Sequence, residues 1–338
     1  MSFTSGSAVR RRDFIRITAG SAAAWAWPAA AQQRAKIARI GLLRTGTISD
    51  TGVNIDAFRQ GLVELGYEEG AGFTIAAREA DGRIERLPGL AKELVTLKVD
   101  VIVAVATPAG RAAQQATSTI PIVVTAMGDP VGDGLVASLA RPGANVTGTT
   151  FLGPELVPKR LTFLKQLLPR LSRVAVLWQP GAFGERTTAD MLKETKDAAA
   201  ALGLQLQFVE AQSPNDLERA FSTIAKAGAD AVLPFPSTML FAERKRILDL
   251  AAMNKLPGMY NSREFVELGG LIAYGANLAD LNRRAASYVD KILRGAKPAS
   301  LPVEQPTKFE LFINLKTAKS LGIDVPLLLQ QLADVVID

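Results

Sequence analysis

Residues 120–150 read IPIVVTAMGDPVGDGLVASLARPGANVTGTT and mark the change from one α/β segment to the next. The apolar run at 122–125 predicts a buried strand, and residues 127–130 predict the loop that follows it. Apolar residues over 135–139 have helical spacing and predict a short amphipathic helix. A Pro-Gly turn and a second short strand at 146–150 complete the stretch. We interpret it as the passage between two α/β lobes.

Strand and helix patterns alternate on both sides of this passage. The apolar runs that predict the other strands are at residues 37–43, 73–77, 99–105, 173–178, 204–209, 230–235, 258–261 and 270–274. The main helical patterns between and after them are at residues 56–65, 84–97, 158–168 and 281–293. Thr107 and Pro108 predict a further helix, with Thr107 as N-cap and Pro108 at the first helical position. This alternation predicts right-handed βαβ units and parallel sheets.

Length and charge limit the class of protein. The chain has 338 residues, of which 48% are hydrophobic and 21% charged, as in a soluble protein of two ordinary domains. The formal net charge of +6 includes four Arg and one Asp in residues 1–31, so the rest of the chain carries +3. A charge this small and dispersed does not predict nucleic-acid binding.

Missing residue types exclude several kinds of chemistry. The chain has no Cys and no His, which excludes disulfides, thiolate nucleophiles and Ser-His-Asp catalysis. The loop after the first strand reads Arg-Thr-Gly-Thr at 44–47 and does not match the dinucleotide-binding glycine pattern, and no P-loop occurs. No carboxylates cluster at predicted strand ends. We therefore expect no catalytic residues, no cofactor and no metal.

Residues 1–31 have the features of an export signal. Arg10, Arg11 and Arg12 begin a charged segment with a twin-Arg pattern, and a modestly apolar stretch at 17–27 follows. Small residues then end at Ala31, so cleavage is predicted there and the mature chain would begin at or near Gln32. The apolar stretch is far below the ~20 residues of a membrane span, which favours periplasmic export over a retained anchor. We expect no membrane insertion after cleavage.

Two segments carry a family resemblance. DPVGDGLVASLARPGANVTGTT (129–150) and FINLKTAKSLGIDVP (312–326) closely resemble the ABC-transporter substrate-binding proteins of the tryptophan/tyrosine-binding type. The resemblance covers essentially the whole chain after residue 36. It implies a type I periplasmic-binding fold: α/β, with two doubly wound parallel-sheet lobes joined by a multi-crossing hinge.

The resemblance also suggests how the chain is divided. Lobe 1 is expected to comprise residues 36–148 plus about 276–299, and lobe 2 residues 149–275 plus about 300–338. The crossings between them are predicted near Thr149, near Gly275 and around 302–306. Several short linkers of this kind permit rotation of the lobes but prevent their separation.

The function implied by the resemblance is transport. The chain would be the secreted, non-enzymatic, monomeric solute-binding component of an ABC importer, with a membrane permease as partner. It would capture a small organic molecule (a carboxylate, an amino acid or an aromatic compound) between its lobes by hinge closure. The alternatives are a ligand-sensing module of a receptor or regulatory system and an enzyme on the same fold.

Candidate ligand-binding residues follow the predicted strands, because ligands of open α/β sheets bind beyond the carboxyl ends of the strands. Hydroxyls and backbone N–H groups at helix starts suit an anion. The polar candidates, with one neighbouring proline, are Thr45, Thr47, Thr107, Pro108, Thr125, Asp129, Gln179, Ser237, Thr238 and Asn261. The candidates for an apolar wall are Phe183, Phe235 and Tyr260. Each has an alternative: the hydroxyls can be plain helix caps, Asp129 can cap its own turn, and the aromatic rings can pack in the core.

One position differs from the pattern of the family. Members that bind amino acids often carry Asp where this chain has Ser237. Without that carboxylate, the usual partner of an α-ammonium group is missing. The sequence therefore leaves open an amino acid, another carboxylate or a neutral, partly aromatic compound.

Overall fold

Two sheets, each covered by helices, make up the described part of the chain. The computed structural model describes residues 37–46 and 52–338, without the side chains of residues 52–54. All elements belong to the unit Ala38–Asp338. The export signal predicted for residues 1–31 and the candidate Thr47 lie outside the described residues. In the described residues, no helix is both long and apolar enough to cross a membrane.

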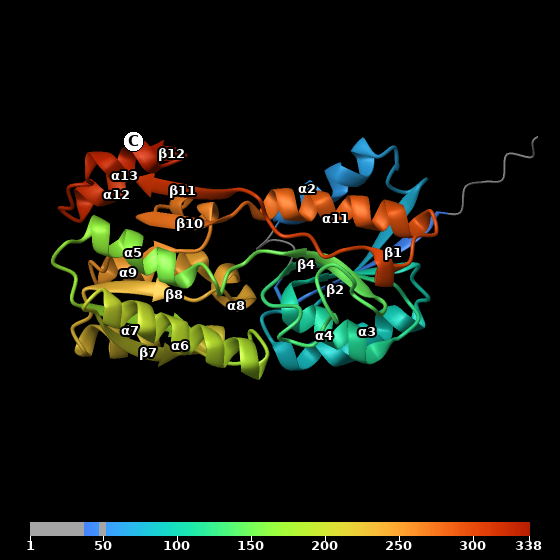
Figure 1. The fold of residues 1–338 in the computed structure, drawn as a ribbon, viewed down its shortest axis with the longest axis horizontal. Coiled ribbons are helices and arrows are strands. Elements are labelled where there is room, and N and C mark those ends of the chain that lie inside the picture. The colour runs from blue at the N-terminus through green and yellow to red at the C-terminus, as the bar shows by residue number, and fades with distance from the viewer. Residues whose placement is uncertain (1–36, 47–51) are drawn as a thin grey trace, which may run out of the picture. The chain divides into compact units, whose positions relative to one another are not determined.

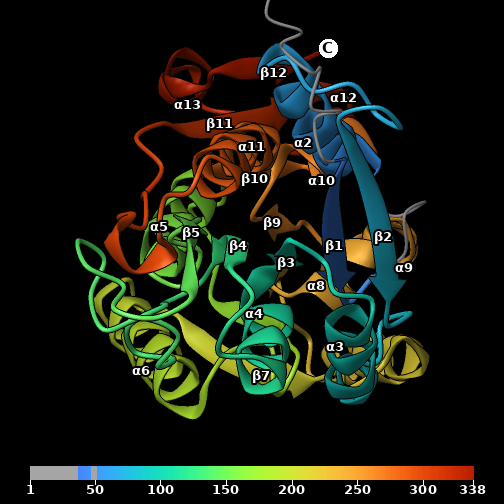
Figure 2. The ribbon, with the colours of Figure 1, turned by 90° about the vertical axis from the view of Figure 1, so that its right-hand side faces the viewer.

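The first sheet has five parallel strands in the order β2-β1-β3-β4-β5. Its strands are β1 (Ala38–Arg44), β2 (Phe73–Glu79), β3 (Val101–Val105), β4 (Ile122–Met127) and β5 (Val146–Thr150). Its helices are α2 (Gly52–Glu64), η1 (Ile84–Arg86), α3 (Leu87–Thr96), α4 (Ala106–Ala116) and α11 (Leu278–Leu293). Apolar side chains alternate between the two faces of the strands, so α3 and α4 cover one face and α2 and α11 the other (Figure 2). We call this sheet with its helices the first lobe.

Close packing of α2 on α11 requires a glycine. A Cβ on Gly61 would lie 2.9 Å from the Cβ of Ala286 and 2.9 Å from the carbonyl oxygen of Arg283. These distances are below van der Waals contact, so the two helices approach one another only because Gly61 has no side chain. The interface joins residues far apart in the sequence.

The second lobe is built on strands of both directions. Its strands are β6 (Arg173–Trp178), β7 (Gln205–Glu210), β8 (Ala231–Pro234), β9 (Met259–Tyr260), β10 (Ile272–Ala276), β11 (Phe309–Asn314) and β12 (Val335–Ile337). They pair in the orders β7-β6-β8 and β12-β11-β10-β9, and a parallel bridge between Val232 and Gly258 joins the two groups. Strand β11 runs antiparallel to β10, whereas the other pairs are parallel.

Helices flank this second sheet, and many of them are labelled in Figure 1. They are α5 (Val157–Leu167), α6 (Glu185–Ala201), η2 (Pro214–Asp216), α7 (Leu217–Lys226), α8 (Thr238–Ala242), α9 (Arg244–Met253), α10 (Arg263–Glu267), α12 (Leu315–Ser320) and α13 (Leu327–Leu332). The short helix η3 (Pro298–Ser300) precedes β11. Two apolar clusters, one on each face of the sheet, form the core of the lobe.

Segments that link the lobes lie beside one another. Residue 304 pairs with the end of β5: the Glu304 N–H donates to the Gly148 carbonyl at 3.0 Å, and the Thr150 N–H donates to the Glu304 carbonyl at 2.8 Å. The buried Arg160 guanidinium donates to the carbonyls of Tyr274, at 2.8 Å, and Gly153, at 3.0 Å. It therefore ties the segment after β5 to β10. The residue limits of the lobes given above remain a prediction.

The loop at residues 131–142 differs from the prediction. The helix expected over 135–139 is wrong, because this segment consists of turns and bends. Leu135 and Val136 are buried in the first lobe, so their apolar character reflects packing and not a helix. The Asp129 carboxylate accepts the Gly132 N–H at 2.8 Å, and Gly134 has φ 71°, which together hold the chain in a turn.

Helix α4 also begins differently from the prediction. Val105 is its N-cap and Ala106 its first residue, so Thr107 and Pro108 lie inside the first turn and the predicted capping role of Thr107 is wrong. The Thr107 hydroxyl instead accepts the backbone N–H of Gly128 at 3.2 Å. The prediction failed because Ala106 adopts φ 65°, a left-handed conformation that turns the chain into the helix one residue earlier.

Candidate functional site

A cavity lies where strand ends of the two lobes meet. The space between its lining residues is about 860 Å³ when the open solvent at its mouth is included. Its lining residues are Arg44, Thr45, Gly46, Ile55, Val105, Ala106, Ala126, Phe151, Ala182, Phe183, Pro236, Ser237, Thr238, Phe241, Asn261, Leu278 and Asn282. We call it the interlobe cavity.

Three phenylalanines form much of the apolar wall. Phe151 and Phe183 are stacked, with ring centroids 6.4 Å apart and an angle of 17° between the rings. The third, Phe241, lies under the Arg244 guanidinium, whose central carbon is 4.8 Å from the ring centroid. Arg244 also donates to the Phe241 carbonyl at 3.0 Å, which fixes this part of the wall. Flat rings held in this way suit an aromatic or aliphatic ligand body.

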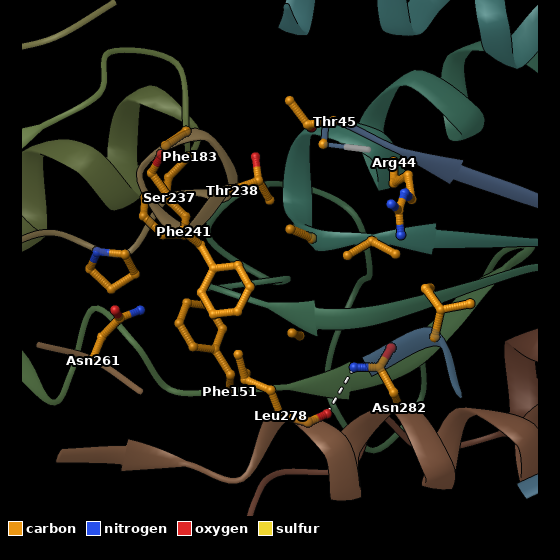
Figure 3. Close-up of a pocket in the computed structure, with 17 residues that line it drawn as sticks. Arg44, Thr45, Phe151, Phe183, Ser237, Thr238, Phe241, Asn261, Leu278 and Asn282 are labelled. Carbon is orange, nitrogen blue, oxygen red and sulfur yellow. Dashed lines mark hydrogen bonds between the residues drawn. The ribbon is translucent and has the colours of Figure 1, made fainter. Parts of the chain in front are cut away.

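The first lobe contributes Arg44, Thr45 and Asn282 as polar residues of the cavity wall. Arg44, the last residue of β1, is 2% exposed, and its Nε lies 3.3 Å from an oxygen of Glu79 on β2. The neighbouring Thr45 hydroxyl is buried and has no hydrogen-bond partner among the described residues. Asn282 of α11 donates to the Leu278 carbonyl at 2.8 Å, as the dashed line in Figure 3 shows. A guanidinium, a hydroxyl and an amide therefore belong to the first lobe's part of the cavity lining.

The second lobe contributes hydroxyls and an amide. Ser237 caps α8 by accepting the Leu240 N–H at 3.1 Å and donates to the Gln179 side-chain oxygen at 2.6 Å. Thr238 and Asn261 lie beside it on the cavity wall (Figure 3). No Asp or Glu lines the cavity in the part of the chain that the structure describes. The cavity thus combines one cation with neutral polar groups.

The strand ends that reach the cavity are conformationally strained. Ala106, after β3, has φ 65°, and Ala126, within β4, has φ 54°. Left-handed backbone is unfavourable for a residue with a Cβ, and such residues are common at functional sites. Both alanines line the cavity.

The family profile described as ABC transporter substrate binding protein matches residues 51–337. The chain belongs to this family. Among curated proteins, the tyrosine-binding protein of Clostridioides difficile (strain R20291) is 29% identical to this substrate-binding protein over 268 residues, which are 79% of this chain and 75% of the relative.

Solved structures agree with the family. A conserved domain protein from Vibrio cholerae is 30% identical, with 89% of this chain and 100% of the other covered and a TM-score of 0.82. The ABC domain from Streptococcus pneumoniae, solved in complex with L-Trp, is 26% identical over the same shares, with a TM-score of 0.81. The predicted fold class is confirmed: the substrate-binding protein has the two-lobed type I periplasmic-binding fold.

Five of the candidates named from the sequence come together in the cavity of this substrate-binding protein. They are Thr45, Phe183, Ser237, Thr238 and Asn261. Gln179 does not line the cavity itself. Its side-chain oxygen accepts a hydrogen bond from the hydroxyl of Ser237, which does. These placements follow from their positions after the strands of the two sheets.

The other described candidates lie away from the interlobe cavity. Thr107 and Pro108 line a second, open hollow, which shares only Phe183 with the first. Thr125 is fully buried in β4, and Asp129 caps its own turn through Gly132.

Two of the aromatic candidates are part of the core. Phe235 is 2% exposed and packs edge-to-face with Phe208, with centroids 6.4 Å apart. Tyr260 is 1% exposed and stacks on Phe265, with centroids 4.6 Å apart. Burial raises the pKa of Tyr260 well above its ordinary value. Both rings therefore support the wall from behind and do not face the cavity.

The sequence did not identify several cavity residues. Arg44 could have been predicted from the sequence, because it is the last residue of the first strand and directly precedes the candidate Thr45. Phe151 follows β5 in the same manner. Phe241 and Asn282 lie inside the helices that follow β8 and β10, and the packing of α8 and α11 brings them to the cavity.

Proposed function

We propose that this chain is the exported solute-binding component of an ABC importer and binds a small carboxylate with an aromatic body. The observation that carries the proposal is a cavity with a buried Arg44 in one part and three phenylalanines along its wall. Family membership supports the binding role. The names of its relatives, a tyrosine-binding protein and a domain in complex with L-Trp, support an aromatic ligand.

The apolar wall provides most of the favourable free energy in this proposal. An aromatic side chain buries about 150–250 Å² when it is enclosed, which corresponds to roughly 4–6 kcal/mol before the entropy of association is subtracted. Phe151, Phe183 and Phe241 supply flat surfaces for such a ring. Orientation must then come from the few polar groups.

Arg44 is the group that we assign to the ligand carboxylate. A guanidinium is a planar fork of N–H donors that matches a carboxylate, and Arg44 already forms an ion pair with Glu79. Its burial makes a charge-assisted hydrogen bond stronger than the same bond in water. The Asn282 amide and the Thr45 hydroxyl also line the cavity and can supply further polar contacts to the ligand.

An α-ammonium group has weaker partners in this cavity. Its possible acceptors are the oxygens of Ser237, Thr238 and Asn261, all of them neutral. We therefore propose that the carboxylate and the ring contribute more to affinity than the amino group does. L-tryptophan and its des-amino analogue indole-3-propionate form the pair of ligands that tests this.

Calorimetric titration of this pair against three chains tests the proposed function. The native chain should bind both ligands, and Arg44→Met should weaken both by about 10- to 100-fold, as expected for loss of a charge-assisted hydrogen bond of about 1.5–3 kcal/mol. Arg39→Met is the matched control, because Arg39 lies on the same strand, is exposed and does not line the cavity. Equal affinities of the native and Arg44→Met chains would remove Arg44 from the site. Absence of binding to the native chain would contradict the ligand class.

Export completes the proposed role. The twin-Arg segment directs the chain to the periplasm, where it would deliver the unchanged ligand to a membrane permease. Replacing Arg11 and Arg12 by Lys should leave the precursor in the cytoplasm. Cell fractionation with immunodetection measures this, and an unchanged periplasmic yield would contradict the twin-Arg route.

A further inference from the structure

A loop of each lobe meets the other beside the interlobe cavity. The first lobe contributes Gly128 and Asp133, from the segment between β4 and β5. The second contributes Phe183 and Gly184, from the segment between β6 and α6. We call these four residues the clasp.

The first contact of the clasp is a ring against a glycine. A Cβ on Gly128 would lie 2.5 Å from Cε1 and 2.6 Å from Cδ1 of Phe183. The ring therefore occupies the space where any other residue would carry its side chain. The Gly128 N–H donates to the Thr107 hydroxyl at 3.2 Å, so the glycine is held in position from behind.

The second contact is a hydrogen bond to a helix N-terminus. The Gly184 N–H donates to Oδ1 of Asp133 at 2.8 Å, and Gly184 is the N-cap of the 17-residue helix α6. The Asp133 side chain is 0% exposed, and the Arg111 guanidinium lies 3.9 Å from the same oxygen. A Cβ on Gly184 would lie 2.3 Å from that oxygen, so this position also requires glycine. A carboxylate at a helix N-terminus is favourable.

We propose that the clasp holds the two lobes together and thereby sets how slowly the ligand leaves the cavity. This proposal rests on the solute-binding function proposed above. Phe183 carries the coupling, because it belongs to both the clasp and the wall of the interlobe cavity. A ligand that packs on Phe183 stabilises the ring against Gly128, and both effects favour the same closed arrangement. Thr107, Gly128, Asp133 and Gly184 act here as positioning residues.

Gly128→Ala is the variant that tests the clasp. Its backbone φ is not in the left-handed region, so alanine is tolerated by the main chain while its Cβ displaces the Phe183 ring. Gly89→Ala is the matched control, because a Cβ on Gly89 in α3 meets nothing within 4 Å. Phe183→Leu provides a second variant that reduces the contact without a clash.

Distances between the lobes are measured without any ligand. The chain has no Cys, so Lys92→Cys on α3 and Ala189→Cys on α6 give two unique spin-label positions, both exposed. Electron paramagnetic resonance should show a short-distance population in the native background that Gly89→Ala preserves. Gly128→Ala and Phe183→Leu should move it to longer distances. Identical distributions in all four chains would overturn the proposal.

Ligand kinetics form the second arm, with L-tryptophan as the probe. Stopped-flow dissociation should be about ten-fold faster for Gly128→Ala than for the native and Gly89→Ala chains, with a much smaller change in the association rate. An unchanged dissociation rate would overturn the role in retention. If the native chain does not bind L-tryptophan, that result counts against the proposed ligand. The spin-label distances, which are measured without ligand, still test whether the clasp holds the lobes together.

Discussion

Two buried charges connect separate parts of the molecule, and their surroundings differ. Burial lowers the pKa of Arg160 to about 9, which leaves this guanidinium protonated at neutral pH. Its hydrogen bonds to two backbone carbonyls compensate part of the lost hydration. Asp133 is in the opposite situation: burial raises the pKa of its carboxyl above the ordinary 3.8, although Thr187, the Gly184 N–H and Arg111 oppose this shift.

Asp133 therefore predicts a pH dependence of stability. A carboxyl whose pKa is raised by folding contributes stability that is present below its ordinary pKa and is lost as the pH rises through the raised value. The free energy of unfolding of the native chain, relative to Asp133→Asn, should be larger at about pH 4 than at about pH 7. Urea denaturation of both chains measures the difference. The charge on Asp129 also raises the pKa of Asp133. If the stability difference between the two chains stays constant or grows with pH, the direction of the pKa shift is contradicted.

At the level of elements, strand β5 depends on a close approach to β4. A Cβ on Gly148, which has φ 140°, would lie 1.9 Å from the carbonyl oxygen of Val124. Any residue other than glycine would therefore have an unfavourable φ at this position, and its Cβ would clash with the Val124 carbonyl. Strand β5 also pairs with residue 304, so its placement affects a second link between the lobes.

Gly148→Ala should consequently be strongly destabilising. We expect a loss of at least about 3 kcal/mol in the free energy of unfolding, because overpacking is added to left-handed strain. Gly134→Ala serves as control, since Gly134 also has positive φ, 71°, but a Cβ there meets nothing within 4 Å. That control should lose only about 1–2 kcal/mol. Chemical denaturation followed by circular dichroism distinguishes the two, and equal losses would contradict the contact argument.

Most elements were predictable from local periodicity, because long apolar runs and helical spacing report burial directly. Residues 131–142 were not, since Leu135 and Val136 are buried within turns and imitate a helical pattern. The antiparallel pairing of β11 with β10 has no local signal. The same reasoning applies to the site: Thr45 and Ser237 follow strands and were found, whereas cavity residues such as Asn282 depend on long-range packing.

At the scale of the whole molecule, the proposed function requires the lobes to move as bodies. Small-angle scattering should give a smaller radius of gyration for the native chain when L-tryptophan is added, because the ligand contacts both lobes. The Arg44→Met chain at the same concentration should change little. After incubation, chromatography should return the ligand unchanged. An unaltered radius with bound ligand would contradict hinge closure, and a converted ligand would indicate an enzyme.

The late position of α11 in the chain has a consequence for synthesis. The last strand of the first sheet ends at Thr150, but the helix that covers one face of it, with α2, begins at Leu278. Ile40, Leu42 and other apolar side chains of that face pack against α11. While the chain is being made, the part of this face that α11 covers stays exposed until most of the second lobe has left the ribosome, and an exposed apolar surface is prone to aggregation. The first lobe to be translated is therefore completed late, and a nascent chain that stops before α11 would need a chaperone to remain soluble.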